Sequence, residues 1–297
     1  MEPKFEFLKD FNEEMNKCNS MVMIVLAPVV KNLRKGYGLR IIILMLLSMS
    51  WFCSQAETIN GFNVIWKGGT TQKQKSVISE LLNNMIKVEG GSFQMGSEEN
   101  YAFENEGPVH LEKVASFWIG KYEVTQKLWE AVMGNNPSYF KGENQPVTYV
   151  SWNDCNEFIQ KLNDITGLRF RLPTEIEWEF AAHGGNKSQG FRISGGTPEF
   201  VAWYKDNSGG RTHDVGTTML GNELNIYDMA GNVKEWTSTE YTSYTTSKFS
   251  GNTYKDGPYY YFRGGSFKDH PRWLRITLRN YENPDSQSDD LGLRLAM

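Results

Sequence analysis

The chain contains little cysteine and little histidine, with 3 Cys and 4 His among its 297 residues. Two of the cysteines, Cys18 and Cys53, belong to an N-terminal segment that we expect to be removed, which leaves Cys155 alone in the mature chain. A single cysteine cannot close an internal disulfide. The fold must therefore be stable without disulfides, even in an oxidising compartment.

The sequence also lacks a block of positive charge in its main body. The 31 Lys and Arg residues are outnumbered by 35 Asp and Glu residues, and the net charge is -4. Nucleic-acid-binding and membrane-surface proteins usually carry a basic patch. We therefore predict that neither nucleic acid nor a membrane surface is a partner.

The longest apolar run lies near the N-terminus and is short. It covers Ile41 to Met49, follows a basic flank that includes Arg34 and Arg40, and precedes Ser54-Gln55-Ala56. Small residues at the last and third-last positions suit a signal peptidase. We predict that residues 1–56 are an N-terminal extension and signal peptide, cleaved after Ala56, and that the protein is exported to the periplasm or beyond. The alternative is a membrane-anchored protein that keeps this helix.

Aromatic residues and glycines are abundant, with 9 Trp, 14 Tyr and 28 Gly. This composition is typical of a loop-rich domain whose core is filled by rings. Apolar spacing and capping residues predict four helices, over residues 71–85, 126–133, 152–165 and 175–183. Short strands, including 114–122, 260–262 and 274–279, are expected between loops. This is an α+β pattern, with a lead segment and helix at 57–84 and the main domain at 85–297.

Five short motifs follow one another in the main domain, and the chain closes on Gly292-Leu293-Arg294-Leu295-Ala296. The five lie at Val88–Gly96, Tyr122–Thr125, Arg171–Glu179, Tyr227–Trp236 and Arg263–Phe267. In this order they resemble the sulfatase-modifying-factor family, which comprises formylglycine-generating enzymes and their non-catalytic relatives. The resemblance implies a C-type-lectin-like fold with few regular elements.

The family's enzymes hold copper with two cysteines just after the last of these motifs. In this chain Asp269 and Leu274 stand near those positions, and neither can supply a thiolate. Cu(I) is a soft ion that prefers sulfur ligands, so the sequence argues against copper. His270 has no second ligand nearby, and Cys155 shares a helix face with apolar residues, where a thiol is inert. Single, scattered histidines likewise argue against the iron used by a related branch.

Calcium is the cofactor that the resemblance implies. In the Tyr227–Trp236 segment the expected ligands are the carboxylates of Asp228 and Glu235 and the backbone carbonyls of Gly231 and Val233. Hard oxygen ligands suit Ca²⁺. The alternative is that these side chains only hydrogen-bond the turn. Lys234 departs from the aromatic residue usual at its position.

Three acids in one motif, Glu175, Glu177 and Glu179, look like the paired carboxylates of acid–base catalysis. Helix capping and the helix dipole explain the first two, and we expect Glu179 to form an ion pair with Arg279 or Arg294.

Two functions remain open. The first is an exported, calcium-stabilised, non-catalytic binding or structural protein of the cell envelope. It would contact a protein or glycan ligand through loops that contain Trp203, Tyr204, Tyr241, Tyr244, Tyr254, Tyr259 to Tyr261 and Trp273. The alternative is that many of these rings belong to the core, which we expect of Trp203 and Tyr261. The second is a sulfatase-modifying oxidase that converts a substrate cysteine to formylglycine. The missing cysteine pair favours the first.

Overall fold

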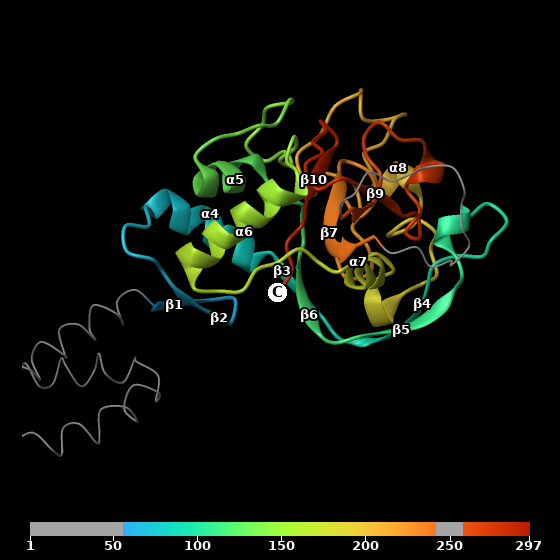
Figure 1. Cartoon of the computed structure of the whole chain (residues 1–297), viewed down its shortest axis with the longest axis horizontal. Helices are drawn as coiled ribbons and strands as arrows, with labels where there is room; N and C mark the ends of the chain where they lie inside the picture. Colours follow the sequence, from blue (N-terminus) through green and yellow to red (C-terminus); the bar gives the residue numbers. More distant parts are fainter. Residues whose placement is uncertain (1–55, 242–257) are drawn as a thin grey trace, which may run out of the picture. The chain divides into compact units, whose positions relative to one another are not determined.

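The computed structural model describes residues 56–241 and 258–297 (Figure 1). The predicted signal segment before Ala56, and Tyr244 and Tyr254, lie outside the described residues. Two compact units divide the chain; of the described residues the first holds 56–58 and 63–66, and the second holds 59–62 and 67–297. Strands β1 (Ala56–Ile59) and β2 (Phe62–Ile65) form a two-stranded sheet. Within the described part of the chain, no helix has the length and apolar character needed to cross a membrane.

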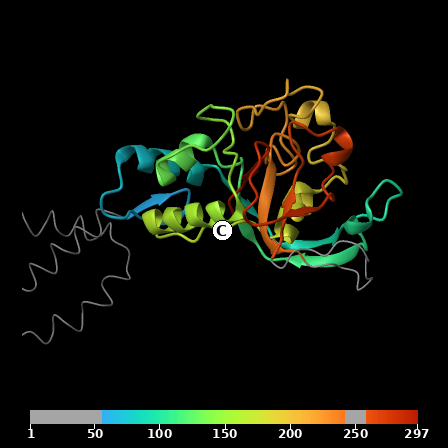
Figure 2. The same cartoon turned by 45° about the horizontal axis from the view of Figure 1, so that its top comes forward.

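Three helices of the second unit lie side by side (Figure 2): α4 (Gln72–Asn83), α5 (Gln126–Met133) and α6 (Trp152–Thr166). The hydroxyl of Thr71, Thr125 or Ser151 caps each helix, because it accepts a hydrogen bond from the first turn. Thr125 and Ser151 were predicted as caps, whereas Thr71 was predicted as the first helical residue. The predicted end of the first helix was two residues too far, since Met85 already belongs to a strand.

The strands of the second unit form one four-stranded sheet and two separate pairs. The sheet has the order β10 (Leu291–Leu293), β7 (Lys234–Glu240), β8 (Tyr260–Arg263), β9 (Asn280–Glu282), with β10 parallel to β7 and the other pairs antiparallel. The antiparallel pairs are β3 (Met85–Val88) with β6 (Phe117–Gly120), and β4 (Gly91–Met95) with β5 (His110–Val114). The α+β prediction is confirmed.

Helix α7 (Glu175–Ala182) contacts both the four-stranded sheet and the β4–β5 pair (Figure 1). Its capping box joins Thr174 and Glu177, as predicted. Burial extends around most of the helix, because Trp178 and Phe180 enter the core while Glu175 and Glu179 are buried as well. Such acids need buried partners.

Two predicted strands differ from the structure. Residues 114–122 divide between the end of β5 and β6, because Ala115 and Ser116 between them belong to no strand. The segment 274–279 contains no strand: a short turn, η3 (Pro271–Trp273), precedes it and β9 begins only at Asn280. Its Leu274 and Arg275 are both buried, so successive side chains do not alternate between core and solvent as a half-buried strand requires. Short helical turns also occur after Gly184, at η2 (Gly185–Lys187) and α8 (Pro198–Val201).

The last described residues lie inside the fold. Leu295 and Ala296 are buried, and Ala296 exchanges backbone hydrogen bonds with Arg171 at 2.8 and 2.9 Å. Met297 does the same with Trp118 at 2.9 and 3.0 Å. Residues 291–297 therefore connect β7 to segments from the first half of the domain.

Candidate functional site

The predicted calcium segment is a tight loop just before β7. Asp228 and Asn232 have the left-handed φ angles of 59° and 54°, and Gly231 has φ 78°. A Cβ atom at Gly231 would lie 2.3 Å from the carbonyl oxygen of Trp203, so only glycine fits this close approach. The turn directs Asp228 and Glu235 into the interior, where both are buried.

Glu235 is fully engaged by two partners. Its carboxylate accepts hydrogen bonds from the Arg294 guanidinium, at 2.6 Å from Nη2, and from the indole nitrogen of Trp178 at 2.7 Å. Glu235 and Arg294 are both inaccessible to solvent. The carboxylate therefore belongs to a buried, hydrogen-bonded ion pair.

Asp228 and Glu123 complete an acidic cluster around the same arginine. Glu123 accepts from the side chain of Asn232 at 2.7 Å and from the backbone of Val233 at 3.1 Å. Asp228 Oδ2 accepts from the Gly216 amide at 2.7 Å, whereas its Oδ1 is buried with no hydrogen-bond partner. Burial raises the pKa of Asp228 to about 6, and burial together with the charges of Asp228 and Glu235 raises the pKa of Glu123 well above its usual value.

The expected calcium ligands consequently fall into two groups. Asp228 offers a buried oxygen without a partner, in a cluster where three carboxylates face one guanidinium, and a hard cation suits that excess of negative charge. Both oxygens of Glu235 are already occupied. The described residues contain no group of three or more His, Cys, Asp or Glu arranged to hold a metal. The residues present thus fit a cation at Asp228 and, in this arrangement, not at Glu235.

The two positions of the family's cysteine pair hold structural side chains. Leu274 is completely buried against Tyr204 and Ala230. Asp269 closes a turn, since its Oδ2 accepts from the amide and hydroxyl of Ser266 at 2.9 and 2.8 Å. Lys234 Nζ lies 3.9 Å from the same oxygen, so two of the three departures from the family pattern, those at 234 and 269, face each other.

Lys234 also joins a second carboxylate, because its Nζ donates to Asp290 Oδ2 at 2.8 Å. The charge of Lys234 helps to hold the pKa of Asp290 below its usual value, against the opposing effect of burial. Lys234, Asp269 and Asp290 therefore form one polar cluster around position 269. No motif in the sequence indicated that Asp290 takes part in it.

Cys155 has the buried position that its apolar helix face predicted, and His270 lies at the surface. Cys155 is a buried free cysteine, and burial raises the pKa of its thiol well above the usual value, with Asp154 adding to the shift. A buried thiol of this kind is unreactive. His270 is exposed, and its Nε2 lies 3.1 Å from Lys205 Nζ.

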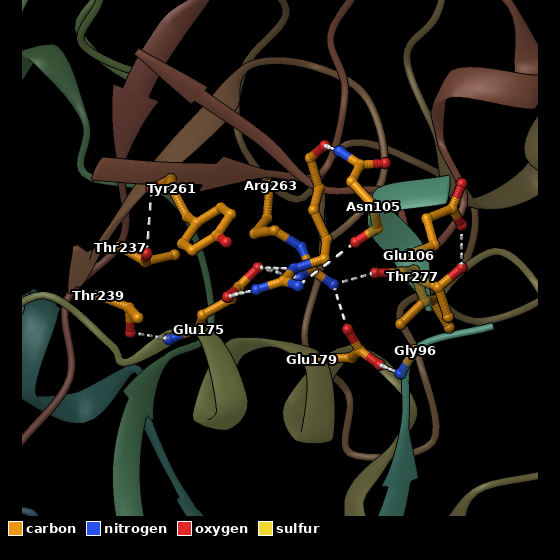
Figure 3. Close-up of polar contacts among 12 residues, drawn as sticks. Gly96, Asn105, Glu106, Glu175, Glu179, Thr237, Thr239, Tyr261, Arg263 and Thr277 are labelled. Carbon is orange, nitrogen blue, oxygen red and sulfur yellow. Dashed lines mark hydrogen bonds and ion pairs between the residues drawn. The ribbon is translucent and has the colours of Figure 1, made fainter. Parts of the chain in front are cut away.

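The acids of α7 form a buried ion-pair network (Figure 3). Arg263 donates to Glu175 at 2.6 Å and also pairs with Glu179, whose other oxygen accepts from the Gly96 amide at 2.7 Å. Arg279 pairs with Glu175, with its Nε at 2.6 Å. The partner predicted for Glu179, Arg279 or Arg294, was wrong, because Glu179 pairs with Arg263. Glu175 lies in the first turn of α7, as the helix-dipole explanation requires, and it also pairs with Arg263 and Arg279. Both acids stabilise the contact between α7 and β8.

Most of the aromatic residues considered for ligand contact are packed inward. Tyr204 and Tyr261 are buried, Tyr260 stacks on Trp152 with ring centroids 3.8 Å apart, and Trp203 stacks on His213 at 3.8 Å. Among the members of this set that the structure describes, Trp273 is the exposed one, with 37% of its surface accessible.

The family model of the sulfatase-modifying factor enzyme 1-like domain matches residues 70–297. The chain belongs to this family. The match takes in the whole predicted helix 71–85 as well as the main domain. Helix, strand and loop content agree with the C-type-lectin-like fold of the sulfatase-modifying-factor domain.

Relatives of this sulfatase-modifying-factor domain carry different names. It is 31% identical to "Inactive C-alpha-formylglycine-generating enzyme 2" of Mus musculus, over 83% of this chain and 95% of the relative. It is 38% identical to "Chaperone protein LppX" of Paenibacillus barcinonensis, over 52% of this chain and 70% of the relative. Among solved structures it is similar to Treponema denticola variable protein 1, with a TM-score of 0.61 and 27% identity over 81% of this chain and 97% of that one.

Proposed function

We propose that this sulfatase-modifying-factor domain is a non-catalytic binding or structural protein. The observation that carries the proposal is the state of the two positions where the family's enzymes have copper-binding cysteines. Leu274 is a core residue and Asp269 is a turn residue, so no thiolate stands at either position. Cys155, the one free cysteine of the described residues, is buried. Relatives named as an inactive enzyme and as a chaperone support the same conclusion.

Export and calcium are further parts of the proposal. The basic flank, the run Ile41–Met49 and Ser54–Ala56 support a signal peptide cleaved after Ala56 and a cell-envelope location; an uncleaved membrane anchor is the alternative. The orphaned oxygen of Asp228 and the crowded negative charge around it support a bound Ca²⁺. Asp228 would hold the ion with the carbonyls of Gly231 and Val233, while Glu235 stays on Arg294. Calcium would contribute a structural cross-link within the loop and no chemistry.

A copper titration of the purified chain, combined with oxygen uptake in the presence of a Cys-x-Pro-x-Arg peptide, tests the proposal. We expect no tight Cu(I) binding and no peptide-dependent oxygen consumption. The variant D269C/L274C restores the sulfur ligands of the family and serves as the matched positive control for Cu(I) binding. Cys155→Ser excludes binding by the buried thiol. Oxygen uptake by the unmodified chain would establish the oxidase alternative and overturn the proposal.

A further inference from the structure

An ordered array of rings and guanidinium groups lies beside the positions of the missing cysteine pair. Phe103 and Trp273 stack with centroids 5.1 Å apart and planes inclined by 28°. Arg272 lies 5.1 Å from the Phe103 ring and 5.7 Å from the Trp273 ring. We call this set the cation–π array; its members are Tyr101, Phe103, Arg192, Arg272, Trp273 and Arg275.

The array rests on a buried anchor, part of which appears in Figure 3. Arg275 is buried and pairs with Glu106, which also accepts from the Thr277 hydroxyl at 2.6 Å. Glu106 further accepts from the backbone amide of Phe103 at 2.8 Å. These contacts fix the loop that carries Phe103 against the turn that carries Trp273. A site fixed in advance loses less entropy when it binds a ligand.

One cation of the array is free to bind an anion. Arg192 pairs with Glu99 at 3.6 Å, and Arg275 pairs with Glu106. Arg272 is exposed, and no carboxylate of the described residues lies within ion-pair distance of it. A guanidinium presents a planar fork that matches a carboxylate or sulfate group. Beside it, Trp273 exposes 37% of its surface.

The form of the array favours a ring-shaped ligand over an extended peptide. A peptide that adds a strand needs an open sheet edge, and a helical peptide needs an apolar groove. Phe103 and Arg272 instead belong to a loop and a short turn, and half of the array is arginine.

We propose that the cation–π array binds an acidic saccharide. The apolar face of a sugar ring would pack on the Trp273 indole, and its carboxylate or sulfate would accept hydrogen bonds from Arg272. The inference rests on the proposed function, because it gives a ligand class to a domain that binds and does not oxidise. It also gives a role to the exposed ring of Trp273 beside Arg272.

Calorimetric titration of the purified chain with oligogalacturonate and chondroitin sulfate hexasaccharides tests the inference. Fully methyl-esterified oligogalacturonate, and chondroitin that is both desulfated and methyl-esterified, keep the rings without the charge and are the matched ligands. We expect Trp273→Ala to weaken binding about tenfold, as the loss of one ring contact implies. Arg272→Gln should weaken the acidic form about tenfold and leave the uncharged form unchanged. Tyr139→Ala and Arg169→Gln remove exposed side chains outside the array and should have no effect.

Three results would overturn the inference. The first is no binding of either acidic series. The second is binding that both array variants leave unchanged. The third is equal, array-dependent binding of a poly-glutamate peptide, which would identify an acidic peptide as the ligand. If the saccharide titration fails and no oxygen is taken up, only this inference is refuted. Peptide-dependent oxygen uptake would refute the proposed function.

Discussion

The indole N–H of Trp178 donates a hydrogen bond of 2.7 Å to Glu235, and this bond joins the middle of α7 to β7 inside the core. The same carboxylate is the partner of Arg294, which also donates to the carbonyls of Gly120 and Tyr227 at 2.9 and 2.8 Å. A single buried acid thus connects three motifs that are far apart in the sequence. The contacts of Arg294 should therefore dominate the stability of the domain.

Arg294→Met should destabilise the fold by about 3–5 kcal/mol, because it leaves Glu235 buried without its cation. The double variant R294M/E235Q should recover part of this loss, since no uncompensated charge remains. Urea unfolding gives the free energies. Arg169→Met, at an exposed arginine, is the control and should cost no more than about 0.5 kcal/mol. Equal losses for the single and double variants would contradict the ion-pair explanation.

Glu179 should make stability depend on pH in the acid range. Burial alone would raise its pKa, but Arg263, His183 and the Gly96 amide lower it to about 2. A carboxyl with a lowered folded-state pKa stabilises the protein above its unfolded pKa, near 4.5, and loses that contribution as the pH falls toward 2. The loss amounts to a few kcal/mol, at about 1.4 kcal/mol per pKa unit.

Comparison of the wild type with Glu179→Gln isolates this effect. The stability difference between the two should be largest above pH 5 and should shrink as the pH approaches 2. Glu123 and Asp228 have raised pKa values and act in the opposite direction, so the difference is more informative than either curve alone. A difference that stays constant with pH would show that the Glu179 pKa is not lowered.

Removal of calcium should lower the melting temperature of the wild type through Asp228. With a chelator present, we expect Asp228→Asn to be at least as stable as the wild type, because the variant removes a buried carboxylate oxygen that has no partner. Adding Ca²⁺ should raise the melting temperature of the wild type and leave the variant unchanged. Asp206→Asn, at an exposed aspartate, should respond like the wild type. A full calcium response in Asp228→Asn would place the ion elsewhere.

Two glycines separate the cost of a left-handed backbone from the cost of crowding. Gly231 and Gly209 have φ 78° and 65°, but only Gly231 has a neighbour that a Cβ would meet, the Trp203 oxygen at 2.3 Å. Gly209→Ala should cost about 1 kcal/mol for its backbone conformation. Gly231→Ala should cost more than about 3 kcal/mol, because the loop must move. Thermal or urea unfolding measures both, and similar costs would show that the close approach is unimportant.

Local signals in the sequence predicted the helices well. Thr71, Ser151 and Thr174 each cap the helix that follows, since the capping hydrogen bonds connect residues only three positions apart. The strand predicted at 274–279 was wrong, because the apolar residues there alternate with Arg275 and Arg279, which are buried in ion pairs rather than exposed to solvent. Periodicity cannot distinguish a buried, paired arginine from a solvated one.

The candidate site was predictable only where a motif marked it. The Tyr227–Trp236 segment pointed to Asp228 and Glu235, and the residues after Phe267 pointed to the loss of the cysteine pair. Glu123 lies in another motif and received no role, although it completes the acidic cluster. Its part, like the pairing of Glu179 with Arg263, depends on contacts between distant segments, which spacing along the chain does not reveal.

The hydrogen bonds of residues 291–297 also bear on the time course of folding. β7 and the residues around Trp118 and Arg171 need this segment to complete their backbone hydrogen bonds. Contacts between segments so distant in sequence form late and slow the folding of a chain. We expect the domain to stay incompletely folded during its synthesis until residue 297 has left the ribosome. For a protein that crosses a membrane unfolded, such a delay would keep the chain competent for translocation.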